Sequence, residues 1–87
     1  MHELSIALSL VELASEEAQR LGAARVNALF VRVGSLSGVV ADALRFSFDL
    51  AAEGSIVEGA RLELEAVDGG DLQLRALEVM DGVAADC

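Results

Sequence analysis

Two segments in the second half of the chain alternate strictly between apolar and polar residues, the period of a β-strand with one buried face. The apolar positions are Leu62, Leu64 and Ala66 in the first segment and Leu72 and Leu74 in the second. A three-residue turn over 68–70 sets Ala66 opposite Leu72 and Leu64 opposite Leu74, so the apolar faces coincide. On the polar face it sets Glu63 opposite Arg75 as a cross-strand charge pair. A two-residue turn would set a glutamate against a leucine and place charge in the core. We therefore predict an antiparallel hairpin, with the second glycine of the turn at positive φ.

Two further segments have the three- and four-residue periodicity of amphipathic helices. The first runs over residues 4–21 and stops at Gly22, because glycine adopts the left-handed conformation that often ends a helix. The second begins after Ser37, a suitable capping residue, and runs to about Ala52. The expected core-facing residues are Leu4, Ala7, Leu8, Val11, Ala14, Ala18 and Leu21 in the first helix and Val40, Ala43, Leu44, Phe48 and Ala51 in the second, where Phe46 and Leu50 widen the stripe.

Residues 25–33, between the two helices, predict a strand that is apolar on both faces, because β-branched and aromatic residues are frequent in it. Such a strand is interior or covered on each side. Together the elements predict an α+β fold in which two helices pack on one face of a three-stranded sheet that ends in the β-hairpin. We expect one domain over residues 1–87. The alternation is lost after Val79, so residues 80–87 are expected to be a frayed tail.

The charge balance argues against two classes of partner. Fifteen acidic residues against six basic ones give a formal net charge of −9. Such a surface repels phosphate backbones and anionic lipids, so we expect neither nucleic acid nor membrane as a partner. No signal peptide or membrane-spanning run is visible. The single cysteine, Cys87, has no partner for an intrachain disulfide, which agrees with a reducing compartment. We expect a cytoplasmic protein.

Catalysis finds little support in the residue types present. His2 is the only histidine, Cys87 is the last residue, and no paired carboxylate site is apparent. General acid-base or nucleophilic chemistry would require a histidine in a cleft, such a carboxylate pair or an activated thiol. We therefore predict that the protein is not an enzyme.

The opening Met1-His2-Glu3 is a chelating arrangement in its covalent structure alone. The α-amine, the His2 amide nitrogen and the imidazole Nδ1 can close a five-membered and a six-membered ring around one ion. Nitrogen donors in a plane suit Ni(II) or Cu(II) better than Mg²⁺ or Ca²⁺, which prefer oxygen. Ni(II) is the first candidate for such a site, and the alternative from the motif alone is an incidental histidine, as a single histidine near a terminus usually is. The fourth ligand is not assigned.

The order of features along the chain resembles the HypA/HybF family of nickel metallochaperones. The resemblance rests on the Met-His-Glu opening, on the loop Gly34-Ser35-Leu36-Ser37-Gly38-Val39 and on residues 43–49, 58–64 and 77–79. It implies a domain that carries Ni(II) for the maturation of [NiFe]-hydrogenase and sometimes of urease. With this resemblance we predict Met1, His2 and Glu3 as the nickel site and Asp42 as a candidate outer contact. It also implies two partners, a nickel GTPase of the HypB type and the precursor of the hydrogenase large subunit.

Two departures from the family pattern bear on function. Family members carry, between their last two strands, a zinc-binding insertion with two Cys-x-x-Cys pairs. In this chain residues 67–72 run straight across that position, with the short turn 68–70 in place of the insertion, so no zinc is expected. Residues 40–42 read Val-Ala-Asp where relatives often have Glu-Pro-Glu.

These departures leave a second interpretation open. The chain is then a protein-protein interaction module of the hydrogenase assembly pathway that no longer carries nickel. A second copy of the chain is a further candidate partner, because an exposed sheet edge can pair with another strand to form a homodimer.

Overall fold

The computed structural model describes residues 2–80 and 82–85, with side chains for residues 3–80. Two helices, α1 (His2–Arg20) and α2 (Ala41–Ala52), accompany four strands, β1 (Val26–Gly34), β2 (Arg61–Val67), β3 (Leu72–Val79) and β4 (Gly82–Ala85). The α+β fold and the three expected strands are confirmed. The expectation of a frayed tail is wrong for residues 82–85, because β4 pairs antiparallel with β3 and makes the sheet four-stranded.

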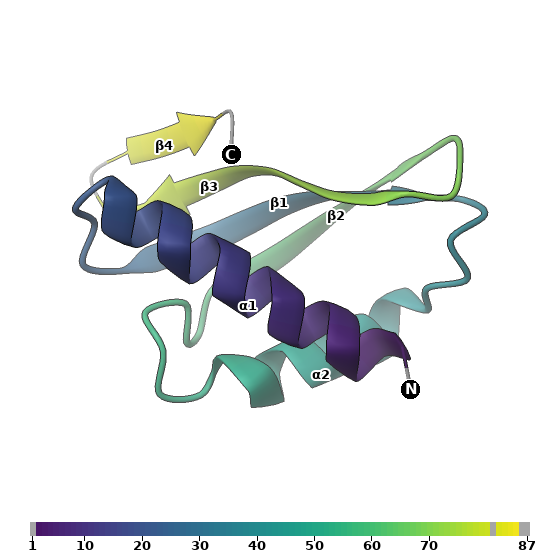
Figure 1. The fold of residues 1–87 in the computed structure, drawn as a ribbon, viewed down its shortest axis with the longest axis horizontal. Helices are drawn as coiled ribbons and strands as arrows, with labels where there is room; N and C mark the ends of the chain where they lie inside the picture. The colour runs from purple at the N-terminus through teal and green to yellow at the C-terminus, as the bar shows by residue number, and fades with distance from the viewer. Residues whose placement is uncertain (1, 81, 86–87) are drawn as a thin grey trace.

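The strands lie in the order β2-β1-β3-β4, with β1 parallel to β2 and antiparallel to β3 (Figure 1). The predicted hairpin is therefore wrong, since β1 separates the two strands that were expected to pair. Ala66 and Leu72 both lie opposite Val33 in β1, one on each side. Alternation identified correctly which residues share a face. It could not identify the neighbouring strand, because the alternation of side chains specifies the faces of a strand and not the partner at each edge.

The segment 68–71 crosses the end of β1 instead of making a tight turn. Neighbouring strands are about 4.8 Å apart, so the crossing spans about 10 Å, which four residues cover easily. The amide of Gly34 donates to Asp71 O at 2.7 Å, and the amide of Leu36 donates to Gly69 O at 2.8 Å. Positive φ occurs at Gly69 (103°), and Gly70, which was expected to adopt it, does not.

Gly34 gives a testable consequence of this crossing. A Cβ atom at this position would lie 2.4 Å from the carbonyl oxygen of Gly69 and 2.9 Å from the amide nitrogen of Asp71. Both are main-chain atoms and cannot rotate away. Gly34→Ala should therefore lower the free energy of unfolding by about 1–3 kcal/mol, the usual effect of overpacking. Urea denaturation followed by circular dichroism measures this, and Gly70→Ala, where the added atom meets nothing within 4 Å, is the control.

The core lies between the sheet and the two helices, which pack on one of its faces. Its largest fully buried side chains are Phe48, Leu10, Leu29, Leu44, Leu77, Val26, Val31 and Val57. The buried line of α1 passes through Ala7, Leu10 and Ala14, so the expected core positions Leu4 and Leu8 are 46% and 53% exposed. The apolar stripe that the helical periodicity predicts is wider than the face of α1 that packs against the core. For this reason some residues of the stripe are exposed.

Candidate metal centre

The first turn of α1 begins at His2, so the expected metal-binding residues lie at a helix start. Met1 and the His2 side chain lie outside the described residues. Glu3 is described, and its carboxylate reaches a distant part of the chain. Its Oε2 atom accepts a hydrogen bond from the backbone amide of Val40 at 3.1 Å. The amino terminus is thereby attached to the start of α2.

This contact replaces the cap that the sequence suggested for α2. Ser37 was expected to cap the helix, but Ser37 Oγ accepts only the amide of Val39, at 3.3 Å, within the preceding loop. The helix begins later, at Ala41, and its N-cap residue Val40 has no capping side chain of its own. The Glu3 carboxylate supplies the acceptor instead. A negative charge is favourable there because the helix dipole is positive at its amino-terminal end.

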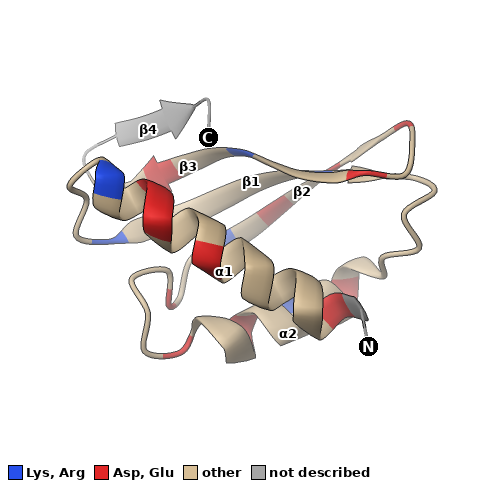
Figure 2. Cartoon of the chain, in the orientation of Figure 1, with Lys and Arg blue, Asp and Glu red and all other residues tan. Residues whose placement is uncertain are grey.

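Asp42 lies in the first turn of α2, two residues after Val40, whose amide donates to Glu3. Its side chain is exposed. Figure 2 shows acidic residues of both helices close to the amino terminus. The structure therefore brings Glu3 and the start of α2 together. Within the described side chains, no group of three or more histidine, cysteine, aspartate or glutamate residues is arranged to hold a metal ion.

Sequence reasoning missed the role of Val40 in this site. The hydrogen bond joins residues 37 positions apart, and it uses a backbone amide that any residue type would offer. The sequence signals for a helix start are a capping side chain close by and acidic residues in the first turn. A carboxylate delivered by another helix gives no such local signal.

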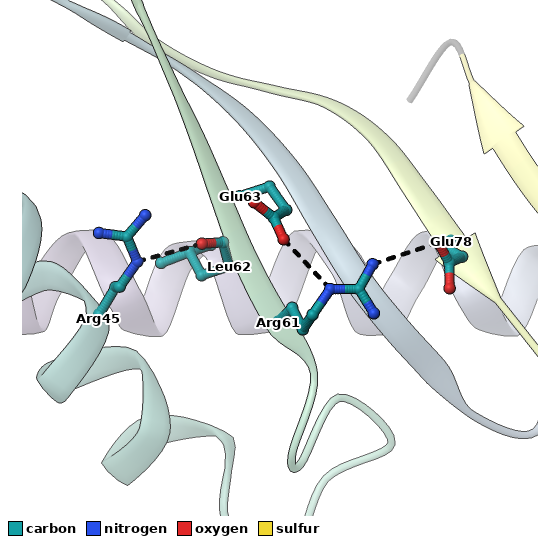
Figure 3. Close-up of polar contacts among 5 residues, drawn as sticks. All are labelled: Arg45, Arg61, Leu62, Glu63 and Glu78. Atoms are coloured by element: carbon teal, nitrogen blue, oxygen red, sulfur yellow. Dashed lines mark hydrogen bonds and ion pairs between the residues drawn. The ribbon is translucent and has the colours of Figure 1, made fainter.

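Several charged residues elsewhere in the described part of the chain form exposed ion pairs. On the sheet face away from the helices, Arg61 bonds Glu63 at 3.2 Å and Glu78 at 3.4 Å (Figure 3). The hydrogen bond that Arg61 donates to Glu63, followed by the charge of Glu78, raises the pKa of the Arg61 guanidinium. The cross-strand pair expected between Glu63 and Arg75 is wrong, because Arg75 lies 3.9 Å from Glu65 instead.

A break in the pairing of β1 with β3 explains why Arg75 contacts Glu65 and not Glu63. Phe30 lies opposite Ala76 and Val31 opposite Leu74, so Arg75 is the extra residue of a bulge in β3. Its guanidinium lies 5.9 Å from the centre of the Phe30 ring, a cation–π contact. A bulge redirects side chains locally. These charged side chains lie on the open sheet face, and none of them belongs to the amino-terminal site.

Two solved structures share this fold. A Ni metallochaperone HypA from Helicobacter pylori superimposes with a TM-score of 0.66 at 23% identity, covering 98% of this chain and 70% of that one. A structure titled HypA protein superimposes with a TM-score of 0.71 at 21% identity, covering 92% of this chain and 97% of that one. At these identities the likeness concerns the fold. No helix among the described residues is long and apolar enough to cross a membrane.

A family model described as "Hydrogenase/urease nickel incorporation, metallochaperone, hypA" matches residues 1–72. The chain belongs to the HypA family.

Among curated relatives, a hydrogenase maturation factor HypA from Roseiflexus is 61% identical over 67 residues, which is 77% of this chain and 54% of the relative. The corresponding factor from Deinococcus radiodurans is 51% identical over 69 residues, which is 79% of this chain and 58% of the relative. These matches therefore cover just over half the length of each relative.

Proposed function

We propose that this chain binds Ni(II) at its amino terminus as cargo and passes it on for hydrogenase maturation, without catalysing a reaction. The observation that carries the proposal is the family match, which begins at residue 1 and so includes the Met-His-Glu opening. The hydrogen bond between Glu3 and Val40 supports it, because it fixes the first turn of α1 against α2.

The donors would be the Met1 amine, the His2 amide nitrogen and the His2 imidazole. The first four N–H groups of a helix have no intrahelical acceptor, so loss of the proton from the His2 amide breaks no helical hydrogen bond. The positive end of the helix dipole disfavours a cation at this place. The deprotonated amide offsets that effect, as do the carboxylates of Glu3 and, as an outer contact, Asp42.

The proposed partners are a nickel GTPase of the HypB type and the hydrogenase large-subunit precursor, in the cytoplasm. A four-cysteine zinc site cannot form within this chain because it has a single cysteine. We therefore propose a nickel-binding domain that lacks the zinc module of its relatives. Its folding should not depend on zinc.

Nickel titration of an untagged chain tests the proposal. We expect about one Ni(II) per chain with the visible absorption of a planar nitrogen site, and an affinity that rises with pH as the donors lose protons. A matched chain with two extra residues before Met1 should lose this site, because its amine has become an amide. Undiminished binding by the extended chain would contradict the site. Absence of nickel binding by the untagged chain would favour the interaction-module interpretation.

A further inference from the structure

Among the residues that the structure describes, no strand lies beside the outer edge of β2, so main-chain groups are open along it. β2 is the last strand on its side of the sheet. The carbonyl of Val67 accepts the amide of Ser35, at 2.7 Å, on the β1 side. Because main-chain direction alternates along a strand, the amides and carbonyls of Leu62, Leu64 and Ala66 point away from β1. Such an edge is a template for a further strand.

A groove of about 320 Å³ adjoins this edge, between β2 and the first half of α2. Val33, Val39, Leu64 and Ala66 give it an apolar lining, and Arg45 is its charged residue. The groove also borders the metal centre, because Val39 immediately precedes the residue that Glu3 caps. An apolar side chain that entered here would lie under the edge of β2.

Arg45 indicates that a segment bound at this edge would also carry a negative charge. Its Nε donates to Leu62 O at 3.3 Å, which holds the guanidinium at the edge of β2, on the side away from β1 (Figure 3). Arg20, Arg32, Arg61 and Arg75 form ion pairs with carboxylates. Within the described part of the chain Arg25 and Arg45 form none, and of these two only Arg45 lines the groove. An arginine without a carboxylate in a chain of net charge −9 is a binding point for an incoming one.

A second copy of the chain, paired through β2, would not supply that carboxylate. The helix-facing residues of β2 are Leu62, Leu64 and Ala66, and the glutamates of this strand lie on the opposite face. Two chains of net charge −9 also repel one another. The edge therefore fits a segment of a different protein better than another copy of this one.

We infer that the β2 edge binds an extended segment of a partner protein as an added strand. An apolar residue of that segment would enter the groove, and an acidic residue two positions away in the segment would pair with Arg45. Main-chain hydrogen bonds to Leu64 and Ala66 would give affinity, and the alternate side chains would give specificity. The two positions share one face because side chains alternate along a strand. The inference does not rest on nickel binding.

The test uses a metal-free, ¹⁵N-labelled chain and the peptide acetyl-Thr-Ile-Thr-Glu-Thr-Ile-Thr-amide. This peptide has an isoleucine two positions before and two positions after its glutamate, so it fits whether the added strand runs parallel or antiparallel to β2. The Leu64 and Ala66 amides should shift and exchange with solvent more slowly when the peptide is added. Replacing the glutamate of the peptide by glutamine should weaken binding about fivefold, as expected for a charge-assisted bond at a partly exposed site. Arg45→Gln should weaken it equally, and the two changes together no further.

Arg25→Gln is the matched control, since the Arg25 side chain donates to the main-chain oxygen of Glu58 and does not line the groove. If Arg45→Gln fails to fold, the glutamate and glutamine peptides can still be compared on the unchanged protein, and that comparison tests the inference. Three results would overturn the inference: no shifts at millimolar peptide, shifts confined to other elements, or equal binding of both peptides. Self-association that protects Leu64 and Ala66 without peptide would also overturn it, in favour of a second copy.

Discussion

Phe48→Ala should lower the free energy of unfolding by about 3–5 kcal/mol, the range for removing a buried aromatic side chain. Phe48 is 1% exposed and belongs to the core cluster that also contains Leu10 and Leu29. Domains of this size have only about 5–15 kcal/mol of stability in total, so the variant should be close to unfolding at room temperature. Circular dichroism in urea is the appropriate measurement, because the chain has no tryptophan or tyrosine.

Phe46→Ala is the matched control, since it removes the same side chain two residues earlier in α2. Phe46 is 66% exposed, so the change should cost less than about 0.5 kcal/mol. The sequence pattern included both phenylalanines in the apolar stripe of this helix. Equal losses for the two variants would mean that the helix presents a different face to the sheet.

His2→Ala should reduce the affinity for Ni(II) by at least about 100-fold. Loss of an outer-shell partner of a metal ligand already costs about 10–100-fold, and the imidazole is proposed as a direct donor, so its loss should cost at least as much. The remaining amine and amide can close only the five-membered ring. Isothermal titration of the untagged variant, with visible spectroscopy, measures the change. Equal nickel binding by the variant and the original chain would refute the site.

Glu3→Gln and Asp42→Asn test whether these side chains coordinate nickel or only help to position the site. In the first variant the side-chain amide oxygen can still accept the hydrogen bond from Val40, but the side chain carries no charge. We expect at most about 1 kcal/mol of lost stability, within the range for a helix cap, and a smaller loss of nickel affinity than for His2→Ala. Asp42→Asn should change nickel affinity least, because Asp42 is proposed only as an outer contact. A loss on Asp42→Asn as large as that of His2→Ala would move Asp42 into the coordination sphere.

Short-range patterns determined most of the secondary structure. Gly22 ends α1 as expected, with φ of 72° and a hydrogen bond from the amide of Ala23 to Ala18 O at 2.9 Å. The alternation of residues 61–66 and 72–74 correctly placed Leu64 and Leu74 on one face, since both lie opposite Val31. These features follow from backbone geometry over a few residues, which the local sequence controls.

The order of the strands was decided by tertiary packing. Alternation specifies the face on which a side chain lies, and the same pattern fits a strand pair or a pair separated by a third strand. In the structure β1 pairs with β2 along one edge and with β3 along the other, so the two alternating segments lie on opposite sides of it. The strand Gly82–Ala85 has the same origin, because it forms by pairing with the edge of β3 and no alternation in its own residues predicted it.

The sequence by itself determined the chemistry of the amino-terminal motif, because the amine, amide and imidazole are joined by covalent bonds, although its metal remains a prediction. The tertiary structure alone decided where that motif lies. Glu3 meets Val40 because α1 and α2 pack together, and Arg45 reaches the edge of β2 because α2 lies beneath it. Contacts between residues far apart in the chain depend on the whole packing arrangement, and no local pattern encodes them.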